Sequence, residues 1–125
     1  MAVEFDNGLS LEALLSTMNE RLIALLGRDH TIGHAWLMDV FCFEDLQKAF
    51  SNKILPLLKE FFYNDYAKIG LVLGKRFVEG KTVGQKMFAD FDEGNELASE
   101  YADKNIYNIK DPFELSIDDF KTIYE

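Results

Sequence analysis

The chain is poor in several residue types, and each shortage excludes a class of protein. Its one cysteine, Cys42, cannot form an internal disulfide, so we expect a reducing compartment. The surrounding apolar run WLMDVFCF predicts a buried, unreactive thiol. No apolar stretch reaches the roughly 18 residues of a membrane-spanning helix, and the start, MAVEFDNG, lacks the features of a signal peptide. These absences predict a cytoplasmic protein with no membrane association.

Basic residues are also scarce. Lys and Arg together number 13 against 22 Asp and Glu, which gives a net charge of −9. A chain of this charge repels a phosphate backbone, so we expect no direct nucleic-acid binding. The stretch 90–103, DFDEGNELASEYAD, contains acidic residues and no base. We interpret it as a solvated acidic loop.

The apolar content is high enough for a folded core. Of the 125 residues 48% are hydrophobic, and eleven are phenylalanine. This composition predicts one ordered domain over residues 1–125, with a helical part at 9–74 and a β-rich part at 75–125.

Helical periodicity runs through the first half of the chain. The inward stripe of a helix over 11–26 would be Leu11, Leu14, Leu15, Met18, Leu22, Leu25 and Leu26. Ser10 is its predicted N-cap and Gly27 the residue after its end. A short helix over 31–38, capped by Thr31, should follow. Further helices are expected from residue 44, kinked or divided at Pro56, and over 65–74.

The second half of the chain has short β-favouring runs in place of helical periodicity. Residues 76–79 and 86–91 are β-favouring runs separated by a glycine-containing turn, which predicts a hairpin. Residues 105–109 could add a third strand. A capping box, Ser116 with Asp119, should open a last helix that reaches Tyr124. The order of helices, small antiparallel sheet and C-terminal helix predicts an α+β fold.

The stretch RDHTIGHAW, residues 28–36, contains both histidines of the chain. His30 and His34 could share one helix face, as in a metalloprotease, but Thr31 stands where the catalytic Glu would be. With no third ligand at a fixed offset, we expect no metal site. The tripeptide at 80–82, GKT, matches only the end of a phosphate loop, so we expect no catalytic residue in this chain.

The runs MNERLIALLGRDHTIGHAWLMDV and LQKAFSNKILPLLKEFFYNDYAKIGLVLG resemble the C-terminal part of the McrB-type AAA+ NTPases. These are the motor subunits of methylcytosine-directed restriction systems. The resemblance covers residues 9–74, and the ending YNIKDPFELSIDDFKTIYE is less specifically similar. It implies a helical lid that closes over a nucleotide-binding core, and no residues of this chain match that core.

The resemblance also implies a site and partners. In AAA+ proteins a basic residue at the start of a lid helix reaches the nucleotide phosphates. By position this is His34, with Arg28 as the alternative, and His30 and Gly33 would lie near the nucleotide. The parent protein would use GTP or ATP with Mg, whereas this chain alone would hold no cofactor. The implied partners are the AAA+ core of the same parent chain, neighbouring AAA+ subunits and an McrC-like nuclease subunit.

A second interpretation stays open. The chain could be a stand-alone protein-interaction module, with a packed helical core and a strand edge for binding.

Overall fold

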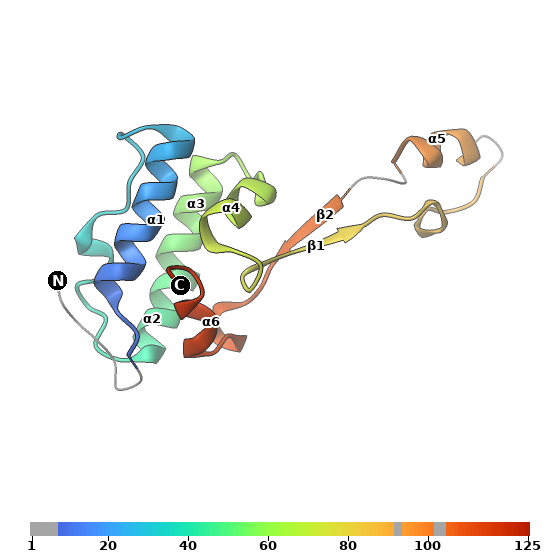
Figure 1. The fold of residues 1–125 in the computed structure, drawn as a ribbon. Coiled ribbons are helices and arrows are strands. Elements are labelled where there is room, and N and C mark those ends of the chain that lie inside the picture. Colours follow the sequence, from blue (N-terminus) through green and yellow to red (C-terminus); the bar gives the residue numbers. More distant parts are fainter. Residues whose placement is uncertain (1–7, 92–93, 102–104) are drawn as a thin grey trace.

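The computed structural model describes residues 8–91, 94–101 and 105–125, and it has two parts (Figure 1). The helical body comprises residues 8–77 and 110–125. The arm comprises the described residues between 78 and 109, and it extends away from the body (Figure 1).

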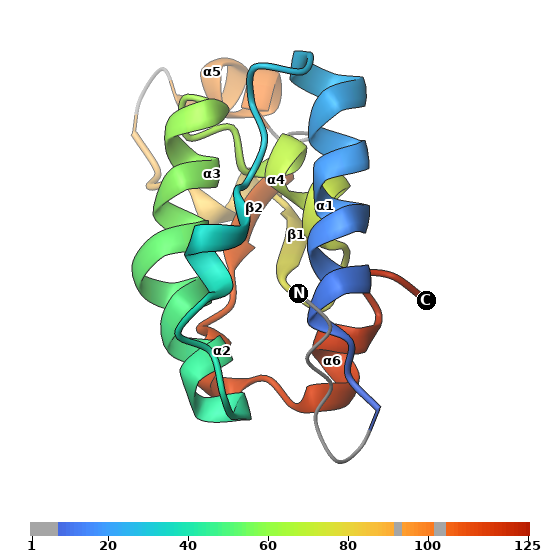
Figure 2. The same ribbon diagram turned by 90° about the vertical axis from the view of Figure 1, so that its left-hand side faces the viewer.

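Most elements belong to the helical body. They are α1 (Leu11–Leu26), the 3-10 helix η1 (His34–Leu37), α2 (Phe43–Ala49), the π-helical turn η2 (Phe50–Ile54), α3 (Leu55–Phe61), α4 (Tyr66–Leu73), the 3-10 helix η4 (Pro112–Glu114) and α6 (Ile117–Lys121). The segment 27–42 crosses one face of the body between α1 and α3 (Figure 2).

The first helix has the predicted bounds and caps. Ser10 Oγ accepts a hydrogen bond from Ala13 N, and Gly27 adopts a φ of 95°, which glycine adopts without strain. The predicted stripe is buried from Leu11 to Leu22, but Leu25 is 39% exposed and its inward assignment is wrong. It lies in the final turn, where the core no longer covers both sides of the stripe.

Pro56 is accommodated without a break. Residues 43–61 run as α2, η2 and α3, and the junctions at Phe50 and Leu55 keep right-handed helical dihedrals. Proline lacks the N–H for a regular helical bond, and its ring crowds the preceding turn. The π-helical turn η2 ends at Ile54, two residues before Pro56, and its wider geometry replaces the regular helical bonding there.

The C-terminal segment closes the core of the body. The rings of Phe50, Phe77 and Phe120 contact one another with centroids 4.9 to 5.7 Å apart, and all three are fully buried. The predicted capping box of α6 is present, although the helix ends at Lys121 and not at Tyr124. Residues that follow the arm in sequence therefore complete the core that α1 begins.

The arm is a two-stranded antiparallel ribbon with a helix beyond its far end. Strand β1 (Val78–Thr82) pairs with β2 (Asn105–Ile109), with Val78 opposite Ile109 and Gly80 opposite Tyr107. Between them lie the 3-10 helix η3 (Gln85–Met87) and α5 (Gly94–Tyr101). The α+β class is confirmed.

The predicted hairpin partner is wrong. Residues 86–91 contain the end of η3 and no strand, and β1 pairs instead with residues 105–109, the suggested third strand. Locally, Met87 N donates to Gly84 O at 3.0 Å, so the chain turns where the second strand was expected. Part of the expected acidic loop is helical as α5, while 92–93 and 102–104 lie outside the described residues.

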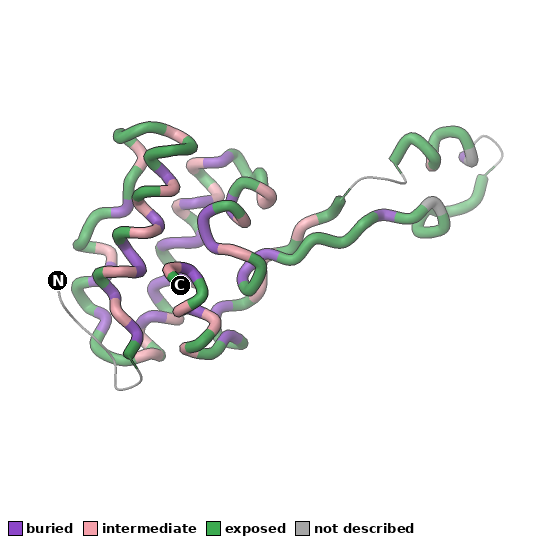
Figure 3. The backbone as a smooth tube through the Cα atoms, in the orientation of Figure 1, coloured by how far each residue is buried: buried purple, intermediate pink, exposed green. Residues whose placement is uncertain are grey.

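Burial differs sharply between the two parts (Figure 3). Purple buried segments alternate with pink and green ones throughout the body, whereas the tube of the arm is almost entirely green and exposed. Of the helices that the structure describes, none has the length and apolar character needed to cross a bilayer.

Candidate functional site

The segment RDHTIGHAW lies in a loop, and α1 fixes the middle of that loop through the hydrogen bonds of Asn19. Asn19 Oδ1 accepts from Ile32 N at 2.6 Å, and Asn19 Nδ2 donates to Ile32 O at 2.8 Å. The Ile32 side chain is buried in the same place. This pair of bonds satisfies both backbone groups of Ile32, as a strand partner would, and fixes the loop against the body. The sequence signal for Asn19 is an amide at the edge of an apolar helical stripe, and sequence reasoning missed it.

His30 packs inward from this loop. Its ring meets the Phe61 ring of α3 edge to face, with centroids 5.1 Å apart and an interplanar angle of 84°. The imidazole is half-buried, and within the described residues its Nδ1 atom has no hydrogen-bond partner. This geometry gives His30 a packing contact that connects the loop to α3.

Arg28 and His34 instead face solvent. Both are exposed, Arg28 in a turn directly after α1 and His34 as the first residue of η1. Within the described part of the chain, neither makes an ion pair. A guanidinium keeps its charge at any relevant pH and offers a fork of donors, while an imidazole offers one or two. The loop therefore presents two nitrogen donors outward at positions set by the Ile32 anchor.

The second helix differs from the prediction. It is a 3-10 helix of four residues, its N-cap is Gly33 and not Thr31, and His30 and His34 do not share a helix face. Gly33 has a φ of −78°, and a Cβ there would meet only Trp36 Cδ1 at 3.8 Å. Neither backbone strain nor close packing requires glycine here. Gly33 O accepts from Trp36 N at 3.2 Å, which opens η1.

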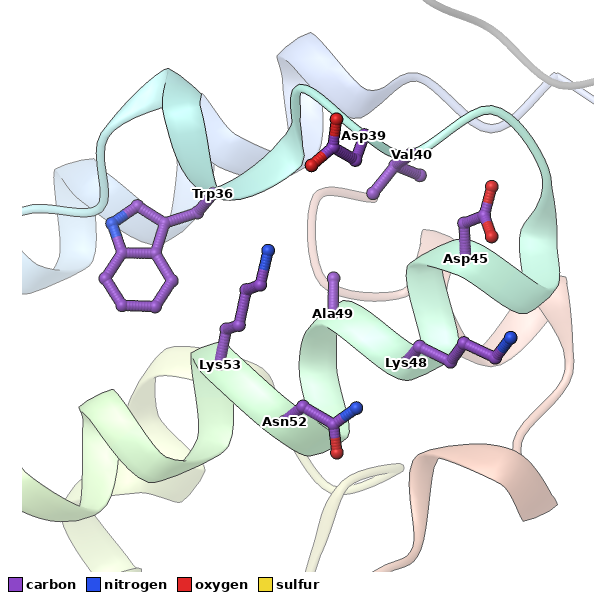
Figure 4. A pocket seen from close by; sticks show the side chains of 8 residues that line it. All are labelled: Trp36, Asp39, Val40, Asp45, Lys48, Ala49, Asn52 and Lys53. Atoms are coloured by element: carbon purple, nitrogen blue, oxygen red, sulfur yellow. The ribbon is translucent and has the colours of Figure 1, made fainter.

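A small pocket lies beside η1 (Figure 4). It has a volume of about 180 Å³ and is lined by Trp36, Asp39, Val40, Asp45, Lys48, Ala49, Asn52 and Lys53. The Lys53 side chain extends from the helix toward the space between Trp36 and Asp39. Two carboxylates and two ammonium groups share the lining, so the pocket has no single sign of charge. Sequence reasoning did not bring these residues together.

Asp45 organises the turn that leads from η1 into α2. Its Oδ2 accepts from Phe41 N at 3.1 Å, and this bond, followed by one from the Cys42 side chain, holds the pKa of Asp45 below its usual value of 3.8. Cys42 is the N-cap of α2 and is exposed, so the predicted burial of its thiol is wrong. In the apolar run around Cys42, some side chains are buried and others face solvent: Val40 is buried, while Phe41 is 75% exposed.

Among the residues that the structure describes, no three His, Cys, Asp or Glu side chains lie close enough together to hold a metal ion.

Comparison with known families identifies the segment that contains this loop. Residues 10–70 match the family described as McrB, alpha-helical lid domain. The match covers just under half of the chain and includes all of RDHTIGHAW, η1 and the helices on which the loop rests. It confirms the resemblance to an McrB-type lid. No curated protein and no solved structure gave a significant match to the chain.

The lid match ends within α4, before the arm begins. The loop with Arg28 and His34 thus lies within the matched segment, whereas β1, α5, β2 and α6 lie outside it.

Proposed function

We propose that the chain acts as the lid of an McrB-like AAA+ GTPase or ATPase. It closes over nucleotide bound with Mg to the core domain of the same parent chain, and it couples hydrolysis to a DNA restriction complex. The single observation that carries this proposal is the lid match over residues 10–70. Neighbouring AAA+ subunits and an McrC-like nuclease subunit are the further partners, and the compartment is the cytoplasm.

Two features of the loop support this role. The first is the pair of outward nitrogen groups, on Arg28 and His34, in a loop whose centre is fixed by Asn19. A lid must present its donors in a constant position, because a phosphate contact contributes to turnover only when its geometry is preorganised. Arg28 and His34 are the groups we assign to the nucleotide. His30 and Gly33 lie close by in sequence and support the loop.

The second feature is exposed apolar surface next to the loop. Met38 and Phe41, in the segment that leads from η1 to α2, are 64% and 75% exposed. Large apolar side chains exposed together mark a surface that another protein element covers. A core domain that contacts this segment would cover both side chains and bring nucleotide toward His34.

The experiment measures NTP hydrolysis by the parent protein, in which this lid follows its core. A charged hydrogen bond to phosphate contributes about 1.5 to 3 kcal/mol, so Arg28→Ala or His34→Ala should slow turnover roughly 10 to 150-fold if the bond forms mainly in the transition state. Lys75→Ala, an exposed cation outside the lid segment, is the matched control and should leave the rate unchanged.

Two results would overturn the proposal. One is a parental hydrolysis rate in both loop variants. The other is micromolar binding of GTP or ATP to the isolated chain, measured calorimetrically, because a lid without a phosphate loop should bind nucleotide feebly and hydrolyse none. A core domain of ordinary size would place a phosphate loop about 150 to 250 residues upstream of this chain in the parent gene. A gene without such a loop would favour the stand-alone interaction module.

A further inference from the structure

The arm carries apolar side chains far from the core. We call the described residues 84–91 and 94–101 the arm tip. Met87, Phe91 and Leu97 of the arm tip are 60%, 57% and 50% exposed. The arm tip contains a hollow of about 350 Å³, lined by Phe88, Ala89, Phe91, Gly94, Leu97, Ala98 and Tyr101. Its volume is at the lower end of clefts that bind small ligands, roughly 300 to 1,000 Å³, so it can admit apolar side chains.

Close contacts fix the walls of this hollow. Gly94 N donates to Phe91 O at 2.8 Å, and a Cβ on Gly94 would lie 2.7 Å from Phe91 Cδ1. Only glycine lets the ring lie this close to the backbone. On the other wall, the rings of Phe88 and Tyr101 meet with centroids 6.3 Å apart. The apolar groups therefore form a shaped surface and are not scattered singly.

The helical body does not cover this surface. In Figure 1 α5 lies at the end of the arm farthest from the body, and Figure 3 shows the arm tip almost wholly exposed. Helix α5 has eight residues, and isolated helices shorter than about 12 residues are only marginally stable in water. An element that buried Leu97 and Phe91 would add the packing that so short a helix needs.

The charge of the arm tip indicates the occupant of the hollow. Asp90, Glu96 and Glu100 are exposed, and Lys86 is the only base of the arm tip as described. A nucleic acid would be repelled, and so would the tip of a second copy. A segment with Lys or Arg beside its apolar side chains has the complementary charge.

Among the described residues, Lys75, Arg76, Lys81 and Lys110 gather at the base of the arm, but their charges are partly engaged. Arg76 Nη1 lies 3.3 Å from Asp119 Oδ1, and Lys110 Nζ lies 3.0 Å from Glu79 Oε1. These pairings favour a different protein over a second copy as the occupant.

We propose that the arm tip is a docking site for a basic, amphipathic segment of another protein, which inserts apolar side chains into the hollow between residues 88–91 and α5. The exposed acidic side chains of the arm tip bind the lysines or arginines of that segment. The site lies outside the lid match and needs no nucleotide, so it stands apart from the proposed lid function.

The test uses a fluorescein-labelled helical peptide with leucines on one face and lysines on both flanks, titrated with the 125-residue chain. Fluorescence anisotropy should report binding that weakens with salt. Leu97→Asp should weaken it by about tenfold or more, because an anchoring side chain in the hollow would meet a charge. Glu96→Lys with Glu100→Lys keeps good helix formers in α5 and should also weaken binding. Leu71→Asp, an exposed apolar position on α4, is the control and should bind as the parent chain does.

Three outcomes would overturn the proposal. The first is equal binding by the Leu97→Asp chain, and the second is equal binding of peptides in which glutamates replace the lysines or serines replace the leucines. The third is a concentration-dependent dimer in sedimentation velocity that Leu97→Asp abolishes, because the occupant would then be a second copy. None of these results bears on NTP hydrolysis by the parent protein, so the two proposals fail separately.

Discussion

The helical body and the arm differ in what holds them in place. In the body, side chains from α1, α2, η2, α3, α4 and α6 share one buried cluster. In the arm as described, the buried apolar side chains are Val78 and Val83. At its base Val78 joins the buried cluster of the body and Tyr107 and Ile109 pack against that cluster, whereas the rest of the ribbon relies on its strand bonds and local ring contacts. Buried apolar area is the main stabilising term of a fold, whereas exposed side chains contribute little. The arm can therefore vary at small cost to the body, which suits a surface that recognises a partner.

The largest expected effect comes from truncating the buried leucines of the body. Leu22→Ala and Leu58→Ala should each lower the free energy of unfolding by about 2 to 5 kcal/mol, because both side chains are fully buried and leave cavities. Leu97→Ala in the arm should cost less than about 0.5 kcal/mol, as an exposed position usually does. Urea denaturation followed by circular dichroism measures all three.

Leu25→Ala sharpens this comparison within one helix. Leu25 lies on α1 with Leu22 but is 39% exposed. Leu25→Ala should therefore lower the free energy of unfolding much less than Leu22→Ala does. A cost below about 1 kcal/mol at both Leu22 and Leu58 would contradict the assigned core. If Leu97→Ala destabilised the chain as much as Leu22→Ala or Leu58→Ala, the helical body and the arm would not differ in what stabilises them.

The same difference explains which elements the sequence could predict. Helices α1, α4 and α6 are predicted correctly because their signals are local: α1 and α4 combine apolar residues at helical spacing with a closing glycine, and α6 begins with a capping box. The pairing of β1 with β2 joins residues more than 20 positions apart, and nothing near residue 82 specifies that partner. Helix α5 did have a local signal, since Leu97 and Tyr101 are four residues apart, but the acidic composition outweighed it.

At the candidate site, sequence reasoning found the segment and missed its support. RDHTIGHAW was recognised as a unit, and the lid match includes it. The bonds between Asn19 and Ile32 and the contact of His30 with Phe61 join distant parts of the chain, so they appear only in the folded structure. The N-cap was placed at Thr31 because threonine caps helices well, whereas the structure begins η1 two residues later. Whether Arg28 and His34 reach a nucleotide stays a prediction, and so does the single-domain division.

A smaller effect is expected where the arm joins the body. Asp119 accepts from Ser116 N at 2.9 Å, and this bond is the main reason why the pKa of Asp119 is lowered from 3.8, with Arg76 adding to it. A carboxyl group with a lowered folded-state pKa stabilises the fold above its unfolded pKa and loses this contribution as the pH falls through the folded value. The stability difference between the parent chain and Asp119→Asn should therefore be present at pH 7 and shrink below about pH 4.

Chemical denaturation at a series of pH values measures that difference. Glu114→Gln, an exposed acid in η4 that makes no ion pair within the described residues, is the control and should show no such change. If the stability difference between the parent chain and Asp119→Asn stayed constant down to pH 2, the charge of Asp119 would not support the capping box.

A local effect is expected inside the arm, at Gly80. A Cβ there would lie 2.9 Å from Cε1 of the opposite Tyr107, so in Gly80→Ala the ring must leave its place on the ribbon. Forcing a side chain off its preferred rotamer costs about 0.5 to 1.5 kcal/mol, which should speed amide exchange in β1 and β2 roughly 2 to 12-fold. The Lys110 amide, bonded to Phe77 O at 2.8 Å where the arm meets the body, should exchange as before. Gly84→Ala, whose Cβ would meet nothing within 4 Å, should leave the ribbon as protected as in the parent chain. Faster exchange throughout the body of Gly80→Ala would mean that the arm and the body unfold as one unit, and the contrast between them would then describe burial alone and not stability.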